Sequence, residues 1–81
     1  MEDQVLEIDQ IYVPVAKRKT LDAAKVDTIA ESILDEGQKT PILVREGDGR
    51  LVLVEGLHRL EACKTLGEDT IVGLLVRPPR R

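Results

Sequence analysis

The strongest candidate for chemistry is a turn from Gly56 to Arg59, between an apolar run and a helical pattern. The first amide groups of a helix have no partner within the helix, and they carry partial positive charge. A glycine at this point lets a ligand approach the backbone closely, and His58 and Arg59 add donors to the same place. Such a turn is suited to hold an anion such as a phosphate group. Glu55, which precedes the turn, adds a carboxylate.

The helical spacing of the residues after the turn predicts where Arg59 lies relative to the buried face of the helix. At 3.6 residues per turn, Leu60, Cys63 and Leu66 share one buried face. Arg59 lies at the margin of that face, so its guanidinium needs an anionic partner. The residues alone leave two partners open, a carboxylate of the fold or a ligand phosphate. Cys63 is the sole cysteine, and on the buried side it is predicted to be a core residue rather than a nucleophile.

A second candidate segment runs from Gly37 to Pro41. Gly37 follows a helical pattern and is suited to end it. Gln38, Lys39 and Thr40 supply polar donors in a loop that Pro41 stiffens, and the Lys39 ammonium is a point charge suited to phosphate. By itself this segment is most simply interpreted as a connecting loop.

The elements that must position these segments follow in the order β-α-β-β-α-β. This order predicts a small α+β domain with a mixed sheet. A first helix begins at Asp22, a good N-cap, and a second helix covers about 57–66. Strands are expected at 5–13, 41–45, 50–54 and 70–76, with a basic, irregular connection at 15–21. The apolar face of the first helix is expected to contain Val26, Ile29, Ala30, Ile33 and Leu34.

Length and composition narrow the function classes. The 81 residues suffice for a single domain over 1–81, with an ordered core at about 5–76 and a tail at 77–81. Tyr12 is the only aromatic residue, which argues against a stacking platform for single-stranded nucleic acid. The net charge of −3 argues against tight nonspecific DNA binding, although basic residues cluster at 17–19 and in the tail. No signal peptide or membrane-spanning run is visible, so a bacterial-type cytoplasmic setting is expected.

Together the two segments resemble the N-terminal domain of ParB-type partition proteins, in the ParB/sulfiredoxin superfamily. The family has an Ala-Glu-Ser-rich helix before a Gly-x-x-x-Pro-Ile loop, matched here by Ala30-Glu31-Ser32-Ile33 and Gly37 to Val44. Its Gly-Glu-Arg-Arg motif with a following Ala is matched by Gly56 to Arg59 with Ala62. The resemblance implies one nucleotide pocket made by both loops. The nucleotide would be CTP, ATP or ADP, with Mg²⁺ as a further expected partner. Arg18 is similar to an arginine that follows the first strand in many members.

Departures from the family leave alternatives open. Sulfiredoxin has Gly-Cys-His-Arg, and Leu57 occupies the cysteine position here, which argues against that chemistry. Free-serine kinases of the same fold have an acidic residue where this chain has Glu55, a candidate base or magnesium ligand. A phosphotransferase, NTPase or nuclease is therefore one alternative. Another is an adaptor with a vestigial pocket that binds DNA or a DNA-bound protein. The residues specify no oligomeric state.

Overall fold

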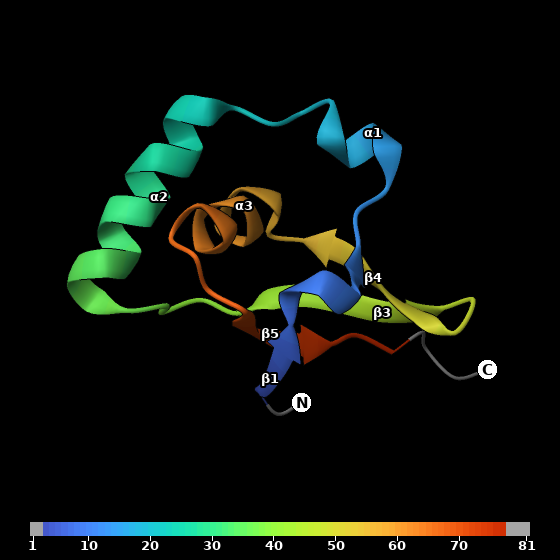
Figure 1. The fold of residues 1–81 in the computed structure, drawn as a ribbon. Helices are drawn as coiled ribbons and strands as arrows, with labels where there is room; N and C mark the ends of the chain where they lie inside the picture. Colours follow the sequence, from blue (N-terminus) through green and yellow to red (C-terminus); the bar gives the residue numbers. More distant parts are fainter. Residues whose placement is uncertain (1–2, 78–81) are drawn as a thin grey trace.

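A computed structural model describes residues 3–77 of the chain. Three helices lie on one side of a mixed sheet of five strands (Figure 1). Among the described residues, no helix is long and apolar enough to cross a membrane. The elements in chain order are β1 (Gln4–Glu7), a 3-10 turn (Ile8–Gln10), β2 (Ile11–Tyr12), α1 (Val15–Arg18), α2 (Ala23–Glu36), β3 (Ile42–Gly47), β4 (Arg50–Glu55), α3 (Leu57–Thr65) and β5 (Thr70–Leu75).

The sheet has the order β1-β5-β3-β4-β2, which puts β3 at its centre. β3 pairs with β4 antiparallel and with β5 parallel. β1 pairs with β5 antiparallel, and the short β2 pairs with β4 parallel. Both the α+β class and the mixed sheet predicted from the sequence are therefore confirmed.

The expected single strand over 5–13 is wrong, because the chain divides into β1 and β2 at opposite edges of the sheet. The 3-10 turn makes the break, and the buried Ile8 donates its amide to the Asp69 carbonyl at 2.9 Å. The reason lies in the spacing of Val5, Ile8 and Ile11. Apolar residues three apart do not share one face of a strand, whose period is two, and Val5 is 72% exposed.

The N-terminal connection also differs from expectation. Residues 15–18 form the short helix α1 rather than an irregular segment. Pro14 precedes it as N-cap, and the Pro14 carbonyl accepts from the Lys17 and Arg18 amides. Proline is compatible with a helix start because the first helical turn needs no amide donor there. The result is a compact basic turn between β2 and α2.

The core lies between the sheet and α3, and a second apolar cluster joins α2 to α3. Ile42, Leu53 and Leu60 are almost fully buried in the first cluster. The second contains Val26, Ala30 and Ala62. Leu34 was expected on the buried face of α2 but is 72% exposed. It lies about 80° around the helix from Val26, beyond the stripe that α3 covers.

Candidate functional site

Gly56 turns the chain from β4 into α3. Its φ is +110°, a conformation that residues with a Cβ rarely adopt. A Cβ built on Gly56 would lie 2.6 Å from Cγ2 of Ile42 and 3.2 Å from its Cα. The turn therefore passes directly over the start of β3, and glycine is required there by packing as well as by backbone conformation.

The N-terminus of α3 leaves amide groups free for a ligand. Gly56 makes no side-chain cap, and the first hydrogen bond of the helix runs from the Leu60 amide to the Gly56 carbonyl at 2.9 Å. The amides of Leu57, His58 and Arg59 precede that bond. Such groups point along the helix axis and carry the positive end of its dipole. The geometry is suited to hold an anion.

His58 joins this end of α3 to the N-terminus of α2. The Asp22 amide donates to Nε2 of His58 at 3.0 Å, so the neutral imidazole carries its proton on Nδ1 in this arrangement. Oδ1 of Asp22 accepts from the Ala24 amide at 2.9 Å, which confirms the predicted N-cap. Two helix N-termini therefore lie side by side, and the Asp22 carboxylate already caps that of α2, so the uncapped amides are those of α3.

A hollow of about 320 Å³ lies beside this junction. Lys25 and Thr28 of α2 line it together with His58 of α3. The sequence analysis did not single out these two residues of α2. The pattern that could have identified them is their i, i+3 spacing just after the Asp22 cap. This spacing puts an ammonium and a hydroxyl on one side of the first turns of α2. The remaining lining residues are Ala24 and Ile29.

Arg59 is half-buried and has no carboxylate partner in the part of the chain that the structure describes. The ion pairs found there are Lys39–Glu36 and Lys64–Glu61. The alternative in which Arg59 pairs with a carboxylate of the fold, such as Glu55, is therefore not observed within residues 3–77.

Arg59 lies close enough to Cys63 to affect its ionisation. Burial raises the pKa of the Cys63 thiol, the charge of Glu68 raises it further, and Arg59 offsets part of the rise. Cys63 is 3% exposed and belongs to the core, which agrees with the structural role predicted for it. A buried thiol with a raised pKa is a poor nucleophile.

The segment from Gly37 to Pro41 is largely engaged within the fold. Gly37 caps α2 with a φ of +76°. Nε2 of Gln38 donates to the carbonyls of Val72 at 2.8 Å and Thr40 at 3.0 Å, and Oε1 accepts from the Val72 amide at 2.8 Å. Lys39 pairs with Glu36. Gln38 thus pairs with β5 as an extra strand residue would.

The two predicted loops approach each other at one end. Ile42, which follows Pro41, packs under Gly56. Gly37, however, ends α2, whereas His58 is bonded to the residue that begins it, and a 14-residue helix is about 21 Å long. A pocket made by Lys39 and Thr40 with the Gly56 turn stays a prediction.

We expect Gln38→Leu to lower the free energy of unfolding by about 1–3 kcal/mol. The substitution removes all three hydrogen bonds of the side chain and leaves the half-buried Val72 amide and carbonyl without partners. Urea unfolding followed by circular dichroism measures the loss. Thr40→Val is the control. Gln38 bonds to the backbone carbonyl of Thr40, which the substitution keeps, so the variant should lose little stability. Equal losses for both variants would contradict a structural role for the Gln38 amide.

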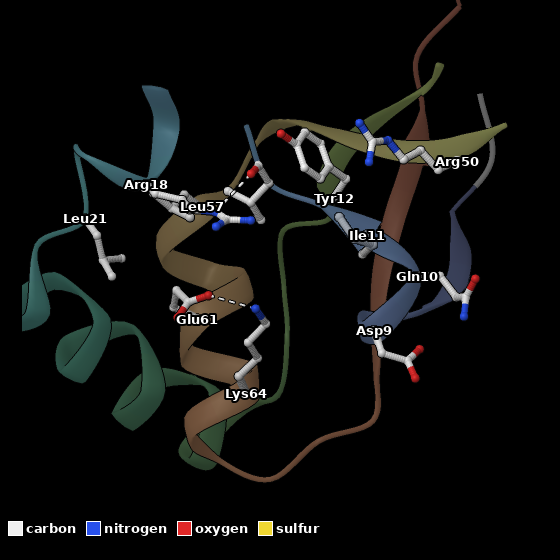
Figure 2. Close-up of a pocket in the computed structure, with 11 residues that line it drawn as sticks. Asp9, Gln10, Ile11, Tyr12, Arg18, Leu21, Arg50, Leu57, Glu61 and Lys64 are labelled. Atoms are coloured by element: carbon white, nitrogen blue, oxygen red, sulfur yellow. Dashed lines mark hydrogen bonds and ion pairs between the residues drawn. The ribbon is translucent and has the colours of Figure 1, made fainter. Parts of the chain in front are cut away.

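Glu55 and Arg18 lie apart from the hollow beside His58. Glu55 is exposed at the end of β4. No group of three or more His, Cys, Asp or Glu residues within 3–77 could hold a metal ion. Nε of Arg18 donates to the Val13 carbonyl at 3.0 Å, and Arg18 faces a different cleft, on the side of Leu57 (Figure 2).

These features define a small α+β domain in which a glycine turn presents a helix N-terminus at the end of β4, an inner strand of the mixed sheet. The ParB N-terminal domain family model matches residues 2–80. The chain belongs to this family, within the ParB/sulfiredoxin superfamily.

Curated relatives agree with this assignment. The chain is 35% identical over 75 residues to a probable chromosome-partitioning protein ParB of Campylobacter jejuni, covering 91% of this chain and 27% of that protein. It is 36% identical over 66 residues to the chloroplastic/mitochondrial sulfiredoxin of Arabidopsis thaliana, covering 82% of this chain and 53% of that protein. The chain thus spans about a quarter to a half of the length of these relatives.

Solved structures share the fold. Sulfiredoxin from Arabidopsis thaliana has a TM-score of 0.86 at 31% identity, over 96% of this chain and 88% of that one. ParB from Caulobacter crescentus, complexed with CTP-γ-S, has a TM-score of 0.81 at 23% identity, over 98% of this chain and 46% of that one. A mutant free serine kinase in complex with ADP has a TM-score of 0.80 at 19% identity, over 94% of this chain and 31% of that one.

Proposed function

We propose that this domain binds a nucleotide and holds its phosphates at the turn from Gly56 to Arg59. The observation that carries the proposal is Arg59, a half-buried residue in the first turn of α3 that has no carboxylate partner within residues 3–77. An anion bound at the start of α3 interacts favourably with the positive end of the helix dipole and with the charge of an arginine in the first turn. A phosphate group satisfies both Arg59 and the amides at once.

The second helix completes the proposed site. The N-terminus of α2 adjoins that of α3 through the Asp22–His58 hydrogen bond. Lys25 adds a mobile positive charge, and Thr28 adds a hydroxyl. We assign the phosphates to the α3 turn and the sugar or base to the hollow beside Thr28 and Ile29, whose walls are mostly apolar.

The class of nucleotide follows from what similar proteins hold. The Caulobacter ParB structure contains CTP-γ-S, and free serine kinase structures contain ADP or AMP. CTP, ATP and ADP are therefore the nucleotides to test, and a link to DNA partition or its regulation belongs to the same proposal. A Mg²⁺ that accompanies a nucleotide is usually held by phosphate oxygens and one or two carboxylates, and Glu55 is the candidate carboxylate at the turn.

Binding is favoured over catalysis by the residues at the turn. Leu57 stands at the sulfiredoxin cysteine position, is 8% exposed and has no nucleophilic atom. Cys63 is in the core, with its thiol pKa raised by burial. The role of Glu55 as a base stays a prediction, since no substrate group or metal is placed against it.

An amide chemical-shift titration with CTP, ATP, ADP and pyrophosphate, each with and without Mg²⁺, tests the proposal. We expect shifts at residues 56–59 and 22–28, and none in β1 at the far edge of the sheet. Pyrophosphate should shift the amide resonances of residues 56–59, and only a whole nucleotide should shift those of residues 22–28. Unchanged spectra at millimolar ligand would contradict the proposal and favour an adaptor with a vestigial pocket.

A further inference from the structure

A second cleft, of about 650 Å³, lies along the side of α3 that carries Leu57, Glu61 and Lys64 (Figure 2), and His58 does not line it. A volume of several hundred Å³ is typical of small-molecule sites. β2, α1, β4 and α3 all contribute to it, so residues far apart in the sequence meet there. Its principal lining residues are Ile11, Tyr12, Arg18, Arg50, Leu57 and Lys64.

Two arginines approach the sole aromatic ring of the chain. The Arg50 guanidinium carbon lies 3.7 Å from the centre of the Tyr12 ring, and that of Arg18 lies 6.0 Å from it. Stacking on the ring fixes the plane of Arg50 and leaves its N–H edge available. Arg18 is fixed independently, by its Nε bond to the Val13 carbonyl. The arginines are thus positioned for a ligand before it arrives.

The charges of the cleft favour a single negative charge on that ligand. Lys64 is paired with Glu61 at 3.1 Å, so these two cancel. Arg18 and Arg50 have no carboxylate within ion-pair distance among the residues that the structure describes, and Asp9 offsets one of them. The net charge of the side chains that line the cleft is therefore close to +1. The planar fork of arginine fits both carboxylate and phosphate, so the net charge near +1 is what favours a singly charged carboxylate over a doubly charged phosphate.

Apolar side chains also line part of the cleft. Ile11 and Leu57 are buried at its floor, and Leu21, which is 44% exposed, lies at its edge. We propose that this cleft binds a carboxylate attached to an apolar group, with Arg50 and Arg18 on the carboxylate and Ile11 and Leu57 under the apolar part. The carboxylate can belong to a small molecule or to the end of a peptide, and the experiment separates these sources.

The side chains of this site differ from those of the nucleotide proposal, although the Leu57 amide belongs to the turn from Gly56 to Arg59. Leu57 faces the cleft, while His58, one residue on, lines the hollow beside α2. Arg50 contributes to the cleft and not to that hollow. Substitution of Arg50 therefore tests the carboxylate site and leaves the turn at Gly56 intact.

The test is a chemical-shift titration with benzoate, benzamide, inorganic phosphate and N-acetyl-phenylalanine. Benzoate and N-acetyl-phenylalanine should shift Tyr12, Leu57 and the Arg50 Nε resonance. Benzamide has the same ring without the charge and should bind at least about tenfold more weakly. Tighter binding of benzoate indicates a small molecule, and tighter binding of N-acetyl-phenylalanine indicates a chain terminus.

Two matched variants test whether benzoate binding depends on Arg50. Arg50→Gln should weaken benzoate binding at least about tenfold. Arg45→Gln, at an exposed arginine of the neighbouring strand, should leave it unchanged. The proposal is overturned if benzamide binds as well as benzoate, if phosphate binds more tightly than benzoate, or if Arg50→Gln has no effect.

Discussion

Gly56→Ala is expected to destabilise the domain by about 2–5 kcal/mol. The backbone there has a φ of +110°, which costs an L-residue about 1–2 kcal/mol. The new Cβ would also lie 2.6 Å from the side chain of Ile42 and 3.2 Å from its Cα. Ile42 is fully buried, so it has no free space to move into, and overpacking of this kind costs about 1–3 kcal/mol.

Such a loss is large for a chain of this size. Domains are stable by roughly 0.05–0.15 kcal/mol per residue, or about 4–12 kcal/mol for 81 residues. Urea unfolding followed by circular dichroism measures the change. Gly49→Ala is the matched control, because Gly49 has a φ of +74° but no atom within 4 Å of its Cβ position. It should show the backbone cost alone.

The comparison separates two explanations of Gly56. If Gly56→Ala costs no more than Gly49→Ala, the Ile42 contact is not what demands glycine. Close approach of a ligand would then be the remaining reason. If the loss is larger, as we expect, packing alone explains the glycine, and the case for a ligand must come from Arg59 and the helix amides.

Local signals in the sequence predicted most of the elements correctly. Asp22 caps α2 as expected. The strands expected at 41–45 and 50–54 are present as β3 and β4, and the turn between them has positive φ values at Asp48 and Gly49. These features depend on residues a few positions apart, and their chemistry restricts the backbone directly.

Features that depend on distant contacts could not be predicted in this way. The break between β1 and β2 requires a place for each strand at opposite edges of the sheet, which no local pattern specifies. Gln38 looks like a ligand donor in the sequence, yet its amide pairs with Val72, 34 residues away. Lys25 and Thr28 join the candidate site only because His58 bonds to the residue that begins α2.

Arg59→Ala is expected to weaken nucleotide binding by at least about 100-fold, while the free energy of unfolding changes by less than about 1 kcal/mol. Arginine can form paired, charge-assisted hydrogen bonds with a phosphate, each worth about 1.5–3 kcal/mol. Within residues 3–77 Arg59 has no carboxylate partner to lose. Its removal should therefore cost affinity and hardly any stability.

Two further variants sharpen this prediction. Arg59→Lys retains the charge without the planar fork, and we expect an intermediate loss of affinity. Arg45→Ala removes an exposed arginine of β3, so it controls for the change in net charge. Isothermal titration with the preferred nucleotide and urea unfolding of the same samples give both quantities. Unfolding of Arg59→Ala, with binding untouched wherever the variant stays folded, would show that Arg59 serves the fold. Lost affinity together with retained stability would instead assign Arg59 to ligand binding, because an arginine without an internal carboxylate partner contributes little to the fold.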